Sequence, residues 1–68
     1  MRLLILSNHI REYRLKFGLS QLALSQKLSV SKNTVSAWER GDYFPRADMA
    51  CLLCKVFSCE FKDLFYFK

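Results

Sequence analysis

The strongest constraint on the fold of this sequence is a very short connection between two amphipathic helical segments. The pattern predicts one helix that begins at Ser20, a good N-cap, and ends near Leu28. A second helix is expected over Lys32 to Arg40, so only a few residues, centred on Ser29 and Val30, separate the two. Two short helices joined this tightly must cross at a steep angle. The sequence therefore predicts a helix-turn-helix arrangement.

The few glycine and proline residues mark the ends of the other segments. Gly18 closes a first helix expected over Asn8 to Phe17, and Gly41 closes the helix that ends at Arg40. Pro45 opens a fourth helix, whose apolar stripe runs to Phe57. A short fifth helix is expected around Phe61 to Phe65. No segment sustains the alternation of a strand, although residues 2–6 could be extended. The expected fold is all-α, a compact bundle of five short helices.

The chain has 68 residues, of which 51% are hydrophobic and 15% aromatic. This length predicts one domain, residues 1–68, with enough apolar material for a packed core. Apolar residues gather at both ends of the chain, within 1–7 and from Phe57 onward. A core of this size does not readily bury all of them. We expect the ends, including residues 66–68, to pack together and to form much of a homodimer interface. These residues include Leu3, Leu4, Ile5, Leu6, Phe61, Phe65, Tyr66 and Phe67.

Charge and cysteine content indicate the type of partner and the compartment. The net charge of +5 and the isoelectric point near 9.4 favour a polyanion, and nucleic acid is the first candidate. Three closely spaced cysteines do not form a disulfide framework, so a reducing cytoplasm is expected. The short apolar run near Arg2 is not a secretion signal, and no segment approaches the roughly 20 apolar residues that cross a membrane.

The residues around the short turn resemble the Cro and phage-repressor (XRE-type) family of helix-turn-helix DNA-binding domains. The resemblance covers about residues 10–65. It implies a lambda-repressor-like fold and binding to double-stranded DNA. Because the family is widespread in bacteria and their phages, the resemblance also implies a bacterial or phage origin. It rests on Gly18-Leu19-Ser20-Gln21, Leu24-Ser25, the run from Leu28 to Gly41 that includes Trp38-Glu39-Arg40-Gly41, and Pro45.

The resemblance implies that the third helix enters the major groove with its N-terminal end. Asn33 suits a bidentate contact with adenine, and Lys32 suits guanine or a phosphate. Ser36 can bond to several bases, and Ala37 could offer its methyl group to thymine. The expected base contacts are Lys32, Asn33, Ser36 and Ala37, and the expected phosphate contacts are Gln21, Thr34, Arg40, Tyr43 and Arg46.

Two further expectations concern structure within the resemblance. Arg14 of the first helix is expected to pair with Glu39 at the end of the third and so to fix the orientation of the helices. Ser25 and Ser29 stand where the family commonly has Ala and Gly. The Ser25 hydroxyl can bond back to the preceding turn, whereas Ser29 is strained if the turn needs a positive φ.

Other residues have plainer interpretations. Trp38 is in phase with Val35 and is expected in the core. Cys51, Cys54 and Cys59 with the single His9 do not make the usual four-ligand zinc site, and we expect helical thiols without a metal. No paired catalytic groups are apparent, so neither an enzyme nor a cofactor or small-molecule ligand is expected. Without the resemblance, Gln21 and the polar start of the third helix would be interpreted as a solvated surface.

The sequence thus favours a small transcriptional regulator, most simply a repressor that binds a pseudo-palindromic operator as a homodimer and lies with the nucleoid in the cytoplasm. The alternative is a protein-interaction module, such as an antitoxin or a regulatory adaptor, built on the same scaffold. A DNA-binding protein should lose affinity steeply as salt is added and should prefer one sequence strongly, whereas an adaptor should not.

Overall fold

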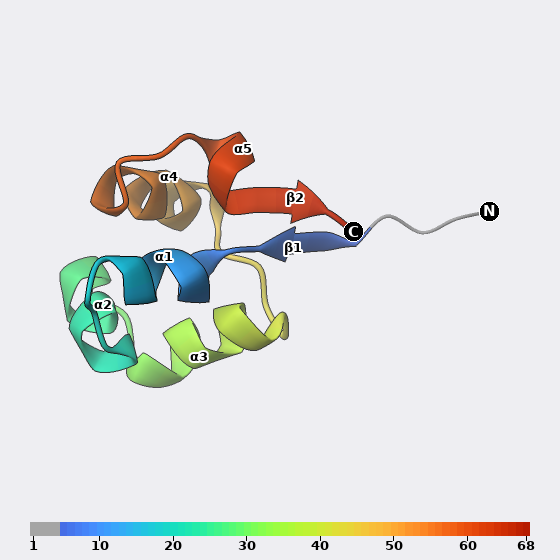
Figure 1. The fold of residues 1–68 in the computed structure, drawn as a ribbon. Coiled ribbons are helices and arrows are strands. Elements are labelled where there is room, and N and C mark those ends of the chain that lie inside the picture. The colour runs from blue at the N-terminus through green and yellow to red at the C-terminus, as the bar shows by residue number, and fades with distance from the viewer. Residues whose placement is uncertain (1–4) are drawn as a thin grey trace.

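The computed structural model of the protein describes residues 5–68 and contains the five expected helices (Figure 1). The expected bounds of the third helix, the expected end of the second and the expected start of the fifth agree with those observed, and the other ends differ by one or two residues. None of the helices in the described part of the chain is long and apolar enough to cross a membrane. The elements in chain order are β1 (Leu6–Asn8), α1 (Ile10–Lys16), α2 (Gln21–Leu28), α3 (Lys32–Arg40), α4 (Ala47–Val56), α5 (Phe61–Leu64) and β2 (Phe65–Phe67).

The structure confirms the helical class and adds a two-stranded sheet that the sequence pattern did not predict. Strands β1 and β2 are antiparallel, with Leu6 opposite Phe67 and Asn8 opposite Phe65. Beyond this pairing, the amide of Lys68 donates to the carbonyl of Ile5 at 2.8 Å. The expected packing of the two ends is therefore confirmed for the described residues. Leu3 and Leu4 lie outside them.

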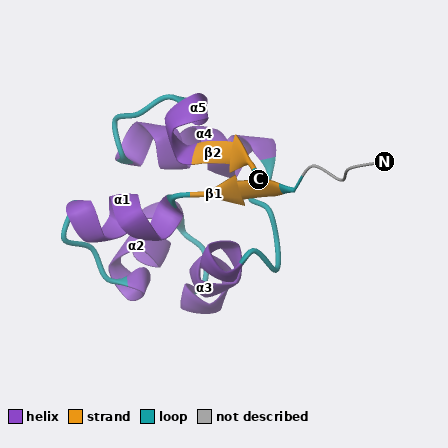
Figure 2. Ribbon diagram, turned by 45° about the vertical axis from the view of Figure 1, so that its right-hand side comes forward, coloured by secondary structure: helices purple, strands orange, loops and turns teal. Residues whose placement is uncertain are grey.

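The core lies where α1, α2 and α3 meet α4 and α5, which occupy the other side of the sheet in Figures 1 and 2. Trp38 is 4% exposed, which confirms it as a core residue. Phe17 is 44% exposed, because it follows the last turn of α1 and covers the edge of Phe57. The buried cluster comprises Ile10, Leu24, Leu28, Val35, Trp38, Ala50, Leu53, Phe57, Leu64 and Phe65.

The N-terminal caps predicted for α2 and α3 are present. The Ser20 hydroxyl accepts the amide of Ala23 at 2.9 Å, and the Ser31 hydroxyl accepts the amide of Thr34 at 3.1 Å. Each cap satisfies an amide that has no partner within the helix. The start of α3 is therefore held by its own sequence, independently of the core.

The first four helices all end in the same way. In each, a residue at or just after the C-cap position has a left-handed backbone. Two amides that follow the helix donate to carbonyls of its last turn, as in a Schellman motif. In the turn between α2 and α3, for example, Val30 donates to the carbonyl of Ser25 at 3.0 Å and Ser29 donates to that of Gln26 at 3.3 Å. The left-handed residues are Gly18, Ser29, Gly41 and Ser58.

The two departures from the family pattern are accommodated as expected. Ser25 is 1% exposed, and its hydroxyl donates to the carbonyl of Leu22 at 2.6 Å. Ser29 adopts φ of 57°, a region that costs a residue with a Cβ atom more than glycine. The turn thus keeps its geometry at the expense of some backbone strain.

We expect Ser29→Gly to raise the free energy of unfolding by about 0.5–1 kcal/mol, because glycine relieves the left-handed strain at small entropic cost. Ser58, with φ of 51°, should respond in the same way. Urea denaturation measures both changes. Ser20→Gly is the matched control, because Ser20 has φ of −77° and is not strained. This variant removes the N-cap of α2, so its stability should fall slightly. A lower stability of Ser29→Gly would show that the left-handed backbone at Ser29 is not strained.

Candidate nucleic-acid interface

The N-terminal half of α3 presents a polar surface to solvent. Val35 and Trp38 point into the core, and this fixes the rotation of the helix about its axis. Lys32 and Asn33 are exposed at the first turn, immediately after the Ser31 cap. Their side chains carry hydrogen-bond donors and, in Asn33, an acceptor. A rigid helix thus holds the two strongest candidates for base contacts at its free end.

The expected Arg14–Glu39 ion pair is present and is almost completely buried. The Nε atom of Arg14 lies 2.6 Å from Glu39 Oε2, and its Nη2 lies 3.2 Å from Oε1. The two side chains are 10% and 6% exposed. A third donor of the guanidinium bonds to the carbonyl of Leu19 at 2.9 Å. Arg14 therefore ties α1 to the end of α3 and to the segment that precedes α2.

Gln21 takes part in the same network, a contact that its expected phosphate role did not include. It is the first residue of α2, and its Nε2 donates to Glu39 Oε1 at 3.1 Å. One Nε2 hydrogen and the amide oxygen are not used by this bond. The ion pair thus orients a side chain at the start of α2, where helix amides point outward.

The arginines expected at phosphates are already paired with neighbouring carboxylates. Arg40 donates to Asp42 at 2.9 Å and also to the Ser36 hydroxyl. Arg46 donates to Asp48 at 3.2 Å. Both ion pairs are more than half exposed, and such pairs contribute only about 0–1 kcal/mol. A phosphate can therefore compete for either arginine.

Ala37 does not have the position that its expected role requires. It is 5% exposed, because it faces the segment that follows α3 rather than open solvent. Its methyl group has little surface to offer a thymine. We therefore leave Ala37 out of the contacts proposed below and regard it as a residue of the packed interior.

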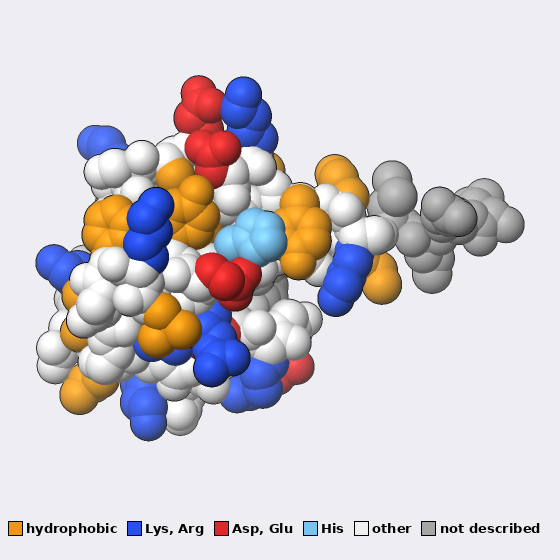
Figure 3. All heavy atoms as spheres, viewed as in Figure 1, with side chains coloured by type: hydrophobic (Ala, Val, Ile, Leu, Met, Phe, Trp, Pro, Cys, Tyr) orange, Lys and Arg blue, Asp and Glu red, His pale blue; other side chains and the backbone are white. Residues whose placement is uncertain are grey.

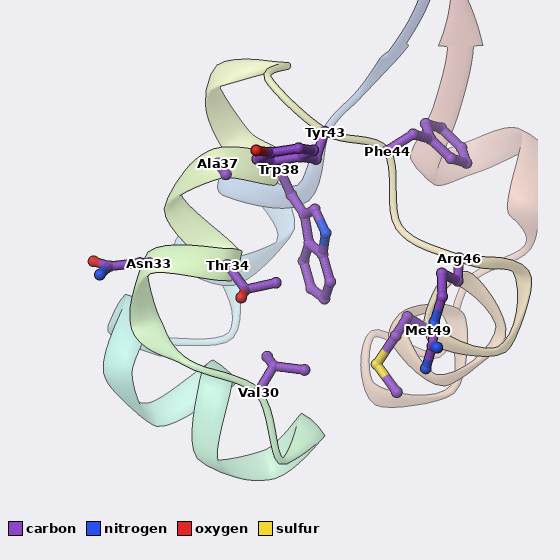
Figure 4. Close-up of a pocket in the computed structure, with 9 residues that line it drawn as sticks. All are labelled: Val30, Asn33, Thr34, Ala37, Trp38, Tyr43, Phe44, Arg46 and Met49. Carbon is purple, nitrogen blue, oxygen red and sulfur yellow. The ribbon is translucent and has the colours of Figure 1, made fainter.

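A groove of about 470 Å³ separates the start of α3 from α4 (Figure 4). Thr34 and Val30 point into it, whereas the side chain of Asn33 points away from it. The Thr34 hydroxyl lies 3.0 Å from that of Ser31. The groove brings five of the expected contact residues to one side of the molecule. Its lining comprises Val30, Asn33, Thr34, Ala37, Trp38, Tyr43, Phe44, Arg46 and Met49.

Charge is distributed unevenly over the molecule. Figure 3 shows several Lys and Arg side chains over the lower part of one face, where α2 and α3 lie, and others at its top and left, with acidic side chains at the top, in the middle and at the lower right. Lys27 and Lys32 are exposed and, among the described residues, neither lies within ion-pair distance of a carboxylate. Glu60 and Asp63 lie on the opposite side, at α5. The two exposed lysines, Lys27 on α2 and Lys32 on α3, suit an approach of these helices to a polyanion.

Two helices joined by a tight turn, with the polar end of the second exposed and its orientation fixed by a buried ion pair, define a helix-turn-helix domain. Comparison with known families identifies it further. A model of the helix-turn-helix family matches residues 10–64. The chain belongs to this family, in its Cro/C1 branch, whose members are DNA-binding regulators.

The relatives come from bacteria and archaea. The chain is 39% identical over 61 residues to YgzD of Bacillus subtilis, named an uncharacterized HTH-type transcriptional regulator, and the match covers 90% of this chain and 92% of YgzD. It is 33% identical to MJ0272 of Methanocaldococcus jannaschii, also named as such a regulator, over 93% and 96% of the two chains. A crystal structure from Bacteroides fragilis shares the fold, with a TM-score of 0.81 at 20% identity, over 90% of this chain and 98% of that one.

Sequence reasoning missed three features of this surface. The bond from Gln21 to Glu39 joins residues 18 positions apart, and no local pattern indicates it. The groove depends on where α4 lies relative to α3, which is equally non-local. The pairing of Arg40 with Asp42 did have a signal, because opposite charges two residues apart after a helix end can meet. The same holds for Arg46 and Asp48.

Proposed function

We propose that the protein binds a specific sequence of double-stranded DNA by placing the N-terminal end of α3 in the major groove. The observation that carries this proposal is the exposed pair Lys32 and Asn33 on a capped helix whose orientation is fixed by the buried Arg14–Glu39 pair. Specific readout needs side chains held in a reproducible geometry, and this arrangement provides it.

Each polar side chain of the surface has a distinct proposed role. Asn33 reads an adenine through a bidentate contact, and Lys32 bonds to guanine or to a neighbouring phosphate. Ser36 adds a contact once its hydroxyl is released by Arg40. Contacts with phosphates on either side of the DNA major groove set the register of the protein on the duplex. The proposed phosphate contacts are Gln21, Thr34, Arg40, Tyr43 and Arg46.

We infer that two copies act together through the joined chain ends. Strands β1 and β2 form a sheet of only two strands, so each has an unpaired edge. Ile5 and Phe67 are 60% and 63% exposed, and Phe61 of α5 is 51% exposed. A two-fold dimer would cover these apolar residues and place two α3 helices about 34 Å apart, which suits a pseudo-palindromic operator. Such a dimer acts most simply as a repressor at a promoter in the nucleoid, within the cytoplasm.

The function is tested by selecting bound duplexes from a random pool. We expect one enriched motif with two inverted half-sites whose centres lie 10–10.5 base pairs apart. The affinity for this duplex should fall with a log–log salt slope of about 0.9 per phosphate contacted. A single unrepeated motif would contradict the dimer alone. Failure to enrich any motif would contradict DNA reading and favour the adaptor function.

The dimer is tested separately by sedimentation equilibrium at high micromolar concentration. We expect the wild-type protein to have twice the mass of the chain, and Phe67→Lys to have the mass of one chain, because the new charge cannot be buried between two sheets. Leu15→Lys is the matched control, since Leu15 is 56% exposed on α1 and should not affect assembly. A monomeric wild-type protein would refute the proposed interface.

A further inference from the structure

The C-terminal end of α4 brings two cysteines together. The amide of Cys59 donates to the carbonyl of Cys54 at 3.0 Å, and the amide of Ser58 donates to that of Lys55 at 3.2 Å. Ser58 has the left-handed φ of 51°. These are the two hydrogen bonds and the backbone of a Schellman motif, in which the third-last helical residue and the second residue beyond the cap bring their side chains into contact. Both of those residues are cysteines here.

The two thiols are also adjacent at their side chains. Cys54 and Cys59 are both half-buried and pack against the same core, beside the side chain of Tyr13. Cys51 lies one turn earlier on α4 and is exposed. Within residues 5–68, no three His, Cys, Asp or Glu side chains gather in a way that could hold a metal ion. The arrangement therefore suits reaction between two thiols better than metal binding.

We propose that Cys54 and Cys59 are a redox modification site that closes to an intrachain disulfide when the protein meets a peroxide. One thiolate attacks a peroxide oxygen, the O–O bond breaks, and a sulfenic acid forms with release of water. The second thiol attacks that sulfur, the S–S bond forms, and a second water leaves. Two thiols lose two electrons and two protons, and the peroxide is reduced to two waters.

The surroundings make this reaction slow at neutral pH. Burial raises the pKa of both the Cys54 and Cys59 thiols, and the nearby carboxylate of Asp63 raises each further. Cys51 adds to the rise at Cys54, while the Tyr13 hydroxyl partly opposes it at Cys59. Because the thiolate is the reactive form, the rate of closure should increase as the pH rises toward the pKa of the pair.

Closure should stabilise the fold without altering the face that carries α3. The backbone bond from Cys59 to Cys54 already holds the two residues together at the end of α4. The connection between α4 and α5 lies on the opposite side of the molecule from α3 in Figures 1 and 2. A cross-link restricts the unfolded chain, and for so short a loop we expect the melting temperature to rise by about 5–15 °C. The affinity for DNA should change by less than about twofold.

The test is treatment of the full-length protein with hydrogen peroxide, followed by alkylation of the remaining thiols in denaturant and intact-mass measurement. We expect the wild-type protein to retain one alkylatable thiol, and peptide mapping to find Cys54 joined to Cys59. Closure should be faster at pH 8.5 than at pH 7. Reduction should restore three thiols and the original melting temperature.

Single variants provide the controls. Cys51→Ser should still lose two thiols, whereas Cys54→Ser and Cys59→Ser should form no intrachain bond. Peptide mapping of the wild-type protein needs no variant to fold, so it decides the matter alone. A bond between Cys51 and Cys54, a disulfide between two chains, or irreversible oxidation of unpaired thiols would each overturn the proposal. Failure of the protein to bind DNA would leave it unaffected, because the thiol pair does not depend on that function.

Discussion

Replacing Glu39 with alanine is expected to lower the free energy of unfolding by about 3–5 kcal/mol, the largest loss that we predict for a polar residue of this protein. The reason is the Arg14 guanidinium, which is 10% exposed and would keep its charge without a carboxylate. The Leu19 carbonyl would be its remaining described partner. Such a loss is a large part of the stability of a small domain.

The measurement is chemical denaturation followed by circular dichroism. Asp48→Ala is the matched control, because the Arg46–Asp48 pair has side chains 79% and 62% exposed and should contribute no more than about 1 kcal/mol. Glu39→Gln keeps one acceptor oxygen beside Arg14 and should lose less than Glu39→Ala. If both Glu39 variants unfold at the wild-type midpoint, the pair has no role in fixing α3.

Replacing Asn33 with alanine is expected to lower the affinity for the selected operator by about 10–100-fold and to relax the preference at one base pair. Asn33 is exposed at the first turn of α3, so its removal should not affect the core. Gln21→Ala should weaken binding to all sequences by a similar factor, because its proposed partner is a phosphate. The two residues thus separate the reading of bases from positioning on the backbone.

The measurement is a fluorescence-anisotropy titration against the operator and against duplexes with each base pair changed in turn. Gln21→Ala also removes the bond to Glu39, so its melting temperature is measured first and its binding is compared at a temperature where it is folded. Uniform losses for both variants would show that Asn33 does not read a base. An unchanged affinity for Asn33→Ala would exclude it from the interface.

The helices could be predicted because their signals are local. Ser20 and Ser31 stand directly before periodic apolar segments, and their hydroxyl groups cap the helices in the structure. Gly18 and Gly41 end α1 and α3 with the left-handed backbone that glycine adopts at least cost. Ser58 ends α4 in the same way but was not predicted, since serine carries no comparable signal.

The sheet could not be predicted because its strands are short and far apart in the sequence. Three residues in β1 and three in β2 are too few to show an alternating pattern. Their pairing depends on the common core that contains Ile10 and Leu64, beside which the amide of His9 donates to the Leu64 carbonyl at 2.8 Å. The expectation that the apolar ends meet was correct, but the hydrogen bonds between them came from tertiary structure.

The features of the candidate site likewise fall into two groups, those predicted from local sequence and those that depend on tertiary packing. The position of α3, its cap and the exposure of Lys32 and Asn33 follow from spacing within about ten residues, and the resemblance placed Arg14 against Glu39. Whether that pair is buried, and whether Ala37 is open to solvent, depend on neighbouring elements. Ala37 is 5% exposed and lines the groove beside Tyr43 and Phe44, which a linear pattern does not indicate.

The sequence by itself determined the position of each helix to within one or two residues and which residues stand at the free end of α3, because caps, glycines and apolar spacing act over a few residues. Only the tertiary structure decided the contacts made by those residues. Gln21 meets Glu39, and Cys54 meets Cys59, through backbone geometry and packing that no linear pattern records. The physical reason is that burial and hydrogen bonding depend on distances in space, which are set only when all five helices are packed together.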